Sequence, residues 1–251
     1  MSTQFSDRNS VIALLRHSPL FSSLANTVLL DMLSHFRRET WKHGRCITGS
    51  ENEQRFHVIL SGRLKMGRIN PETGRIVTLF LLGPGDAFDV ISLLDGEPSP
   101  VTLEAKDDLE LLSTPVEEAR RWIEYHPEFN HSFLPYLGRQ MHLLADLAGD
   151  LALHDTETRL ARLILRHIDT DNSHHSLHLI HDLSHEALGE MIGSVRVVVN
   201  RQLQHWQREG IIISHRGKLV VQELEALLKK AMHHSHNSAA KPSPEKPKNR
   251  H

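Results

Sequence analysis

Residues 184–221 constrain the fold of this chain more than any other segment of the sequence. Apolar side chains recur at helical spacing on both sides of Gly193, at positions 187, 188, 191 and 192 before it and 199, 203 and 206 after it. Ser184 and Ser194 each precede one of these patterns and are candidate N-caps, and Gly193 suits a left-handed turn. Residues 211–221 form two short apolar runs around Arg216 and Gly217, which predicts a hairpin. The segment therefore predicts a helix, a tight turn, a second helix and a two-stranded wing.

The second predicted helix, residues 195–209, carries polar side chains on the face opposite its apolar stripe. A helix-turn-helix places such a face in the major groove of DNA, where Arg196 and Arg201 could contact guanine or phosphate. Spacing alone leaves open that these arginines form the solvated face of an amphipathic helix. The candidate DNA-binding residues are Ser194, Arg196, Val197, Asn200, Arg201, Gln204, Arg216 and Lys218.

The charge of this region is local rather than general. Residues 155–230 hold ten Lys or Arg and ten Asp or Glu, and the whole chain has a formal net charge of -2. Within residues 196–218, five positive side chains accompany one negative side chain. A DNA contact must therefore come from this cluster, because the region as a whole is not basic.

The N-terminal half has a different pattern. Residues 6–37 show helical spacing that Ser18 and Pro19 interrupt. Residues 41–112 consist of short apolar runs separated by glycines, with residues 70–74 (NPETG) predicting a turn between strands. Many short strands at regular spacing are typical of a small sandwich or barrel.

A long helix is predicted from about residue 127 to residue 152, and an apolar stripe within it covers roughly 30 Å at 1.5 Å per residue. Six of its apolar residues recur at alternating steps of three and four, the spacing of a coiled-coil seam. We expect this seam to be a dimer interface, although a core helix of one chain is the alternative. A second stripe, Phe133, Leu143 and Leu147, is predicted to pack on the strand region of the same chain. The seam residues are Leu134, Leu137, Met141, Leu144, Ala148 and Leu151.

These patterns divide the chain into four predicted parts. Residues 1–126 hold the N-terminal helices and the strand region, residues 127–154 the long helix, and residues 155–230 the helix-turn-helix part. Asp155 is a candidate N-cap of the first helix of that part. Residues 231–251, rich in Pro, Lys, His and Ser, are predicted to be disordered.

Composition excludes several classes of protein. None of the apolar runs in the 251 residues approaches the roughly 18 residues of a membrane span, and the first ten residues do not resemble a signal peptide. The single cysteine, Cys46, excludes an intrachain disulfide and an all-cysteine iron–sulfur cluster. We therefore expect a cytoplasmic protein with no membrane partner. The nucleophile, phosphate-loop and HExxH motifs of common enzymes are absent, so we expect no enzymatic activity.

The order of these parts and residues 183–201 (LSHEALGEMIGSVRVVVNR) resemble the Crp/Fnr superfamily of bacterial transcription regulators. The strand region is also similar to this family at Gly49, residues 59–65 (ILSGRLK) and residues 85–88 (GDAF). The resemblance implies an α+β fold: an N-terminal jelly roll of the cyclic-nucleotide-binding type, a long dimerisation helix and a C-terminal winged helix-turn-helix. It also implies a homodimer that binds double-stranded DNA and works with RNA polymerase. The alternative is an effector-binding module that acts through protein partners.

Departures from the family pattern bear on the effector. Members that bind cyclic AMP carry a Gly-Glu-Leu segment for the ribose and an Arg-Ser/Thr pair for the phosphate; here Asp89, Val90 and Ile91 and then Pro100 and Val101 occupy those places. A phosphate would lack its arginine, so we do not expect cyclic AMP to bind in the family manner. The candidate effector-pocket residues are Phe88, Asp89, Val90, Ile91, Pro100, Val101 and Arg139.

Residues 88–96 (FDVISLLDG) and 192–197 (IGSVRV) are more similar to the cyanobacterial nitrogen-regulator branch, which senses 2-oxoglutarate. That effector is therefore a candidate, with Arg139 as a possible carboxylate partner or a solvated arginine. Many relatives have Glu where this chain has Val197. Valine cannot accept a hydrogen bond from cytosine, but it can contact a thymine methyl group.

Twenty histidines raise the question of a metal or haem. His174, His175, His178, His181 and His185 straddle a loop and a predicted strand, so we expect a solvated segment rather than a zinc site. Haem-based sensing occurs in this superfamily, but no ligand motif is recognisable here, and surface or core histidines are the simpler interpretation. The candidate haem ligands are Cys46, His57, His126 and His142.

Overall fold

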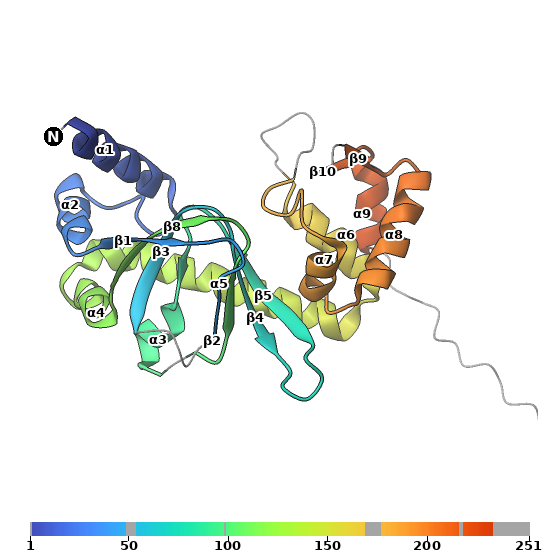
Figure 1. Ribbon diagram of the computed structural model, residues 1–251, viewed down its shortest axis with the longest axis horizontal. Coiled ribbons are helices and arrows are strands. Elements are labelled where there is room, and N and C mark those ends of the chain that lie inside the picture. The colour runs from blue at the N-terminus through green and yellow to red at the C-terminus, as the bar shows by residue number, and fades with distance from the viewer. Residues whose placement is uncertain (1, 49–53, 98, 169–176, 216–217, 233–251) are drawn as a thin grey trace, which may run out of the picture.

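The computed structural model describes residues 2–48, 54–97, 99–168, 177–215 and 218–232. An N-terminal part of two β-sheets and flanking helices is joined to a C-terminal helical part by one long helix, α5 (Pro127–Leu153), which passes behind the strands in the view of Figure 1. None of the helices within these ranges is long and apolar enough to cross a bilayer.

Two four-stranded antiparallel sheets face each other and form the predicted jelly roll. One sheet has the order β1 (Arg37–Trp41), β8 (Leu109–Pro115), β3 (Arg55–Ser61), β6 (Ala87–Phe88). The other has the order β2 (Cys46–Thr48), β7 (Thr102–Ala105), β4 (Leu64–Ile69), β5 (Ile76–Leu82). The predicted turn joins β4 to β5, where the Asn70 side chain accepts hydrogen bonds from the backbone of Glu72 and Thr73. The fold class predicted from the sequence is confirmed.

The first sheet separates two apolar cores, because successive side chains along a strand point to opposite faces of the sheet. Phe56, Val58 and Leu60 of β3 face a helical layer, whereas Ile59 faces the jelly-roll interior. The helical layer consists of α1 (Ser2–His17), α2 (Asn26–Ser34), α4 (Val116–Tyr125) and the start of α5, and Ser18 and Pro19 lie between α1 and α2 as predicted. A short helix that the sequence analysis did not predict, α3 (Val90–Asp95), follows β6.

The long helix carries the predicted seam on its uncovered side. Leu134 is 63% exposed, Met141 71% and Leu151 36%, Ala148 is exposed, and Leu137 and Leu144 are half-buried. We call these six residues the α5 seam. The second predicted stripe is only partly correct: Phe133 is buried in the helical layer, but Leu147 is half-buried and Leu143 is 45% exposed. The buried residues of α5 before its last turn are Phe129, Ser132, Phe133 and Tyr136, so the helix is buried mainly along its first half.

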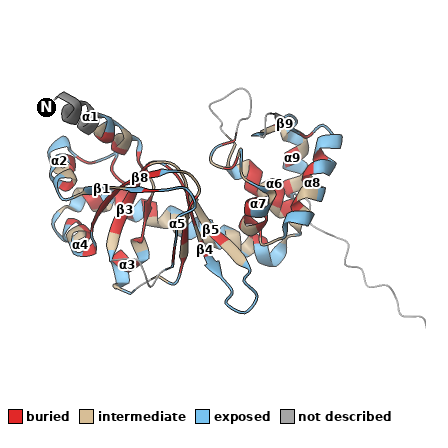
Figure 2. Ribbon diagram, in the orientation of Figure 1, coloured by how far each residue is buried: buried red, intermediate tan, exposed pale blue. Residues whose placement is uncertain are grey.

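The C-terminal part is built around helices that pack their apolar faces together (Figure 2). Asp155 caps α6 (Thr156–Arg166) and Ser184 caps α7 (His185–Met191), each accepting a hydrogen bond from a backbone N–H three residues on, as predicted. These helices precede α8 (Arg196–Arg208), the hairpin of β9 (Ile212–His215) and β10 (Lys218–Val221), and α9 (Leu224–Met232). The predicted hairpin turn at Arg216 and Gly217 lies outside the described residues, as does the predicted disordered tail beyond residue 232.

Two local predictions are wrong. Ser194 does not cap α8, because the helix begins one residue later with Val195 as its N-cap and no side-chain cap hydrogen bond. Residues 177–181 do not form a strand: Leu177 makes one isolated bridge to Ile168, and Leu179 has a φ of 58°, which breaks an extended conformation. His174 and His175 lie outside the described residues.

A set of ionic and backbone contacts holds α7 against β4 and β5, and we call it the β4–α7 contact. Arg63 donates hydrogen bonds to the Leu179 carbonyl at 2.6 Å and to Asp182 at 2.5 Å. Lys65 Nζ lies 2.6 Å from Glu190 Oε2, and Arg75 donates to the Gly193 carbonyl. The orientation of the helix-turn-helix is therefore tied to the second sheet of the jelly roll.

Candidate DNA-binding surface and effector cavity

The second helix of the helix-turn-helix, α8, separates buried from exposed residues as the sequence pattern predicts. Val199, Leu203 and Trp206 are at most 3% exposed and face the C-terminal core. Val197 is 76% exposed, and Val195 just before the helix is 57% exposed. These two valines lie close together at the start of α8, where a recognition helix meets DNA, so this end of α8 is the candidate contact surface.

Glycine makes the turn between α7 and α8 possible. Gly193 has a φ of +60°, and a Cβ atom there would lie 2.5 Å from Leu151 Cδ2 on α5. A Cβ atom on Gly189 would lie 3.2 Å from the Ser194 carbonyl oxygen, which shows how closely α7 approaches the turn. The left-handed residue predicted at Gly193 is confirmed, and any side chain there would meet both backbone strain and a clash.

Five of the eight candidate DNA-binding residues lie on α8. Arg196, Val197, Arg201 and Gln204 are exposed, and Asn200 is half-buried between them. Ser194 precedes α8 and is half-buried, and Lys218 is exposed at the start of β10. Arg216 lies outside the described residues.

A cavity of about 300 Å³ opens between the corner of β6 and α3, strands β4 and β5, and helix α5; we call it the effector cavity. Five of the candidate pocket residues line it: Phe88, Asp89, Val90, Ile91 and Val101. Pro100 and Arg139 are not among its lining residues. The sequence analysis did not predict the lining residues that come from β4, β5 and α5, because only the fold brings these elements together. They are Met66, Leu79, Phe80, Leu82, Leu137, Gln140, Met141 and Leu144.

Arg139 points away from this cavity. Its guanidinium carbon lies 5.9 Å from the ring centroid of Tyr136, and its charge acts on Asp86. Burial raises the pKa of Asp86, an effect that the Gly83 N–H and Arg139 only partly offset. The Tyr136 hydroxyl donates to the Ala87 carbonyl at 3.0 Å, which ties α5 to β6 beside the cavity.

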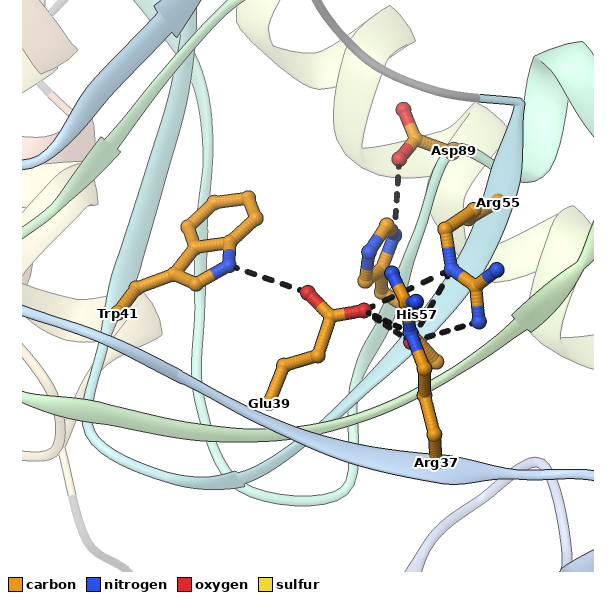
Figure 3. Close-up of polar contacts among 7 residues, drawn as sticks. Arg37, Glu39, Trp41, Arg55, His57 and Asp89 are labelled. Atoms are coloured by element: carbon orange, nitrogen blue, oxygen red, sulfur yellow. Dashed lines mark hydrogen bonds and ion pairs between the residues drawn. The ribbon is translucent and has the colours of Figure 1, made fainter.

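A polar cluster stands behind the cavity, on the first sheet (Figure 3). Asp89, which lines the cavity, is 3.2 Å from Nδ1 of the buried His57, and the His57 ring stacks on Phe88 with 4.5 Å between ring centroids. Two residues before His57 on β3, Arg55 donates hydrogen bonds to the Ser113 hydroxyl at 3.0 and 3.2 Å. The cavity carboxylate is therefore held from behind by a histidine.

The rest of the cluster centres on Glu39. Arg37 Nε donates to Glu39 at 2.9 Å, Ser113 donates to the same oxygen, and Arg55 Nε lies 3.5 Å from it. Burial raises the pKa of Glu39, but the Ser113 and Arg37 hydrogen bonds and the charge of His57 outweigh burial and lower it. The arginines of this cluster are thus already paired with a carboxylate and a hydroxyl.

The histidine and cysteine candidates do not converge on a ligand site. Within the described ranges, no group of three or more His, Cys, Asp or Glu side chains is placed to hold a metal ion. His57 is bonded to Asp89, whereas Cys46 and His142 are exposed on β2 and α5. His126 lies half-buried between α4 and α5.

Comparisons with known proteins agree with this architecture. Residues 39–126 match the family described as cyclic nucleotide-binding domain, and residues 158–230 match the family described as Crp-like helix-turn-helix domain. A global nitrogen regulator from Nostoc sp. is 30% identical over 173 residues, which cover 67% of this chain and 77% of that protein. A CRP-like cAMP-activated global transcriptional regulator from Mycobacterium tuberculosis is 27% identical over 183 residues, 72% of this chain and 81% of that protein.

Solved structures share the fold. A CooA variant from Carboxydothermus hydrogenoformans superposes with a TM-score of 0.68 at 21% identity, over 80% of this chain and 90% of that chain. Together with the two matched domains and the nitrogen regulator, this fold leads to one conclusion: the chain belongs to the Crp/Fnr family of DNA-binding transcription regulators, which are not enzymes and which pair an effector-binding domain with a Crp-type helix-turn-helix.

Proposed function

We propose that this protein is a homodimer that reads a two-fold symmetric DNA operator with the N-terminal half of α8. The observation that carries the proposal is the exposed start of α8, where Arg196, Val197 and Arg201 extend outward while Val199 and Trp206 anchor the helix in the core. A recognition helix docks through its N-terminal residues, and the arginines suit guanine O6 and N7. The remaining DNA contacts are assigned to Ser194, Asn200, Gln204, Arg216 and Lys218.

The α5 seam supplies the dimer contact in this proposal. Alternating three- and four-residue steps keep its six apolar residues on one stripe, and four of them, Leu134, Met141, Ala148 and Leu151, are exposed in a single chain. Burying them against the same stripe of a second copy removes this surface from water. Two α8 helices related by a two-fold axis would then read half-sites about one DNA turn, roughly 34 Å, apart.

Val197 is the residue that we expect to make the operator sequence differ from that of relatives with Glu at this position. Its side chain offers no acceptor for cytosine N4, and its 76% exposure leaves it able to contact a thymine methyl group. We therefore assign an A·T preference to the base pair that Val197 faces. This is a difference in DNA preference from relatives that carry Glu at the same place.

Selection from random double-stranded DNA tests the proposal. The wild type is expected to return a palindrome, and Arg196→Ala to lose the preference at one position of each half-site, at a cost of about 1–3 kcal/mol in binding free energy. Arg208→Ala is the matched control, since Arg208 lies at the far end of α8, and it should return the wild-type sequence. Val197→Glu should exchange the A·T preference for cytosine. Selection of unrelated sequences by the wild type, or an unchanged preference in Arg196→Ala, would contradict the placement of α8.

The effector cavity is the proposed control point. An effector changes DNA affinity only if it binds the two arrangements of the dimer with different affinity, and the cavity is lined by residues of the α5 seam that would move with the dimer helix. The missing phosphate partner argues against cyclic AMP. The sequence leaves 2-oxoglutarate, the effector of the nitrogen-regulator branch, and haem as candidates; RNA polymerase is the further partner that transcription control requires.

A further inference from the structure

We propose that the effector cavity takes an uncharged, largely apolar small molecule with one hydrogen-bonding group, and that it excludes anions. The inference rests on the proposed function only in assigning the cavity to an effector. The class of ligand follows from the side chains that line the cavity and from those that lie behind it.

The lining is almost entirely apolar. Of its sixteen residues, one is charged, Asp89, and two are polar and uncharged, Ser99 and Gln140. The remaining lining residues are aliphatic, aromatic or methionine side chains from both sheets, α3 and α5. Such a lining favours burial of apolar ligand surface, with a few polar groups to orient it.

Among the residues that the structure describes, no lysine, arginine or histidine lines the cavity, and three nearby cationic side chains are engaged elsewhere. His57 faces Asp89, Arg55 is bonded to Ser113 and Glu39, and Arg139 lies over Tyr136. A carboxylate or phosphate in the cavity would therefore lose its water shell and lie near the Asp89 carboxylate, and none of the described lining residues is a cation that could pair with the ligand. Both effects disfavour an anion, which includes cyclic nucleotides and 2-oxo acids.

The volume narrows the class further. An apolar cavity of about 150 Å³ holds benzene, and this cavity measures about 300 Å³. A molecule of about two fused rings, or a chain of similar bulk, matches that space. Phe80 and Phe88 offer aromatic contacts, and Asp89, Ser99 and Gln140 can receive or donate one hydrogen bond at its edge.

The position of the cavity connects this ligand to regulation. Leu137, Met141 and Leu144 belong both to the cavity lining and to the α5 seam. An apolar ligand packed against them would contact seam residues directly, at the surface on which the second copy is proposed to pack. The predicted consequence is a tighter dimer in the presence of the ligand.

Isothermal titration of the full chain with a matched pair of probes tests the proposal. The probes are 2-naphthalenemethanol and 2-naphthoate, which share the same rings and differ in carrying a hydroxymethyl group or a carboxylate. We expect saturable binding of one alcohol per chain, and binding of the carboxylate weaker by about 30-fold or more because it meets Asp89. Equal affinities, tighter binding of the carboxylate, or no saturable binding of the alcohol would overturn the proposal.

Two variants locate the effect. Asp89→Asn removes the charge and keeps the shape, and asparagine tolerates the φ of 63° found at this position. It should bring the two probes to within about threefold of each other, since the repulsion is gone. Asp95→Asn, an exposed carboxyl at the end of α3, is the charge-matched control and should keep the wild-type difference. An unchanged difference in Asp89→Asn would contradict the role of Asp89.

A cavity-filling variant and a seam variant together distinguish ligand binding in the cavity from ligand binding on the seam. Leu79→Trp places a large ring among the lining residues and should abolish alcohol binding, whereas Leu134→Ala, on the seam but outside the lining, should not. The reverse result would place the ligand on the seam and overturn the proposal. DNA affinity of the same samples is measured separately: alcohol binding without any change in DNA affinity would uphold the ligand class and contradict effector control, and loss of DNA recognition alone would contradict the proposed function.

Discussion

Helix α5 adjoins two contacts of opposite chemistry, the α5 seam and the β4–α7 contact. The seam is apolar and open: Leu134 and Met141 are 63% and 71% exposed. The β4–α7 contact is ionic and closed: Lys65 is only 7% exposed and lies between Glu104 at 2.5 Å and Glu190 at 2.6 Å. The charged residues of the β4–α7 contact are paired within the chain, whereas the α5 seam is left exposed.

The difference follows from what each kind of contact requires. Charged side chains must be paired where they are buried, so the β4–α7 contact is complete in one chain. Burial of an apolar stripe against any surface of matching shape is favourable, and in a monomer the stripe remains exposed to water. We infer that the ionic contact sets the orientation of α8 within a chain and that the apolar seam sets the distance between two α8 helices.

The largest effect is expected from a charge on the seam. Met141→Glu would place two carboxylates opposite each other across the two-fold axis, which costs several kcal/mol and should weaken dimerisation by about 100-fold or more. DNA binding should fall with it, because a single half-site lacks the gain of bivalent binding. Sedimentation equilibrium and DNA titration measure the two effects.

Leu143→Glu is the control for that change. Leu143 is 45% exposed on the same helix but lies off the seam, so the same substitution should leave the dimer intact. Equal weakening by both substitutions would show that the seam is not the interface.

The second-largest effect is expected from a substitution at the junction between α5 and α6. Asp150 is 3% exposed in its side chain and accepts from Arg162 at 2.9 Å and from Arg166 at 2.8 Å. Asp150→Asn should lower the free energy of unfolding by about 1–3 kcal/mol, because two guanidinium groups, each about a third exposed, lose their bond to a buried carboxylate. Urea unfolding measures the loss, and the exposed Asp146, changed to Asn, should cost less than about 0.5 kcal/mol.

The smallest effect concerns pH. The Arg63 hydrogen bond lowers the pKa of Asp107, and for Asp182 the hydrogen bond and charge of Arg63 outweigh burial and lower the pKa as well. A lowered folded-state pKa means that the contact stabilises at pH values above the ordinary carboxyl pKa of about 4 and loses that stabilisation as pH falls through the lowered pKa.

Asp182→Asn should therefore cost about 0.5–1 kcal/mol at pH 7, a modest value because the Asp182 side chain is 40% exposed. The difference from the wild type should shrink below pH 4 and vanish at still lower pH. Urea unfolding across this range measures it, with Asp31→Asn, an exposed carboxyl on α2, as control. A difference that persists or grows in acid would contradict the assigned ion pair.

Local signals in the sequence predicted much of this architecture. Ser184, Asp155 and Gly193 take the cap and turn positions that their chemistry favours, because these features depend on residues within one helical turn. The prediction that Ser194 caps α8 is wrong by one position. Helix α8 starts one residue later, so the Ser194 hydroxyl is out of register with the free backbone N–H groups of the first turn.

Features that depend on tertiary structure could not be predicted in the same way. Arg139 and Gln140 are adjacent in sequence, but successive helix residues differ by about 100° in direction, and only Gln140 lines the cavity. The His57–Asp89 and Lys65–Glu190 pairs join residues 32 and 125 positions apart, so strand register and domain packing decide them.

The α5 seam as a two-fold dimer interface is the central claim, and one disulfide trapping experiment tests it most directly. The chain has a single cysteine, Cys46, so a Cys46→Ser background leaves a newly introduced Met141→Cys as its only thiol. In a parallel seam the two copies of residue 141 face each other within disulfide range. The account predicts a disulfide-linked dimer on mild oxidation, whereas Leu143→Cys in the same background stays a monomer. A monomer from Met141→Cys, or equal cross-linking of both variants, would contradict it.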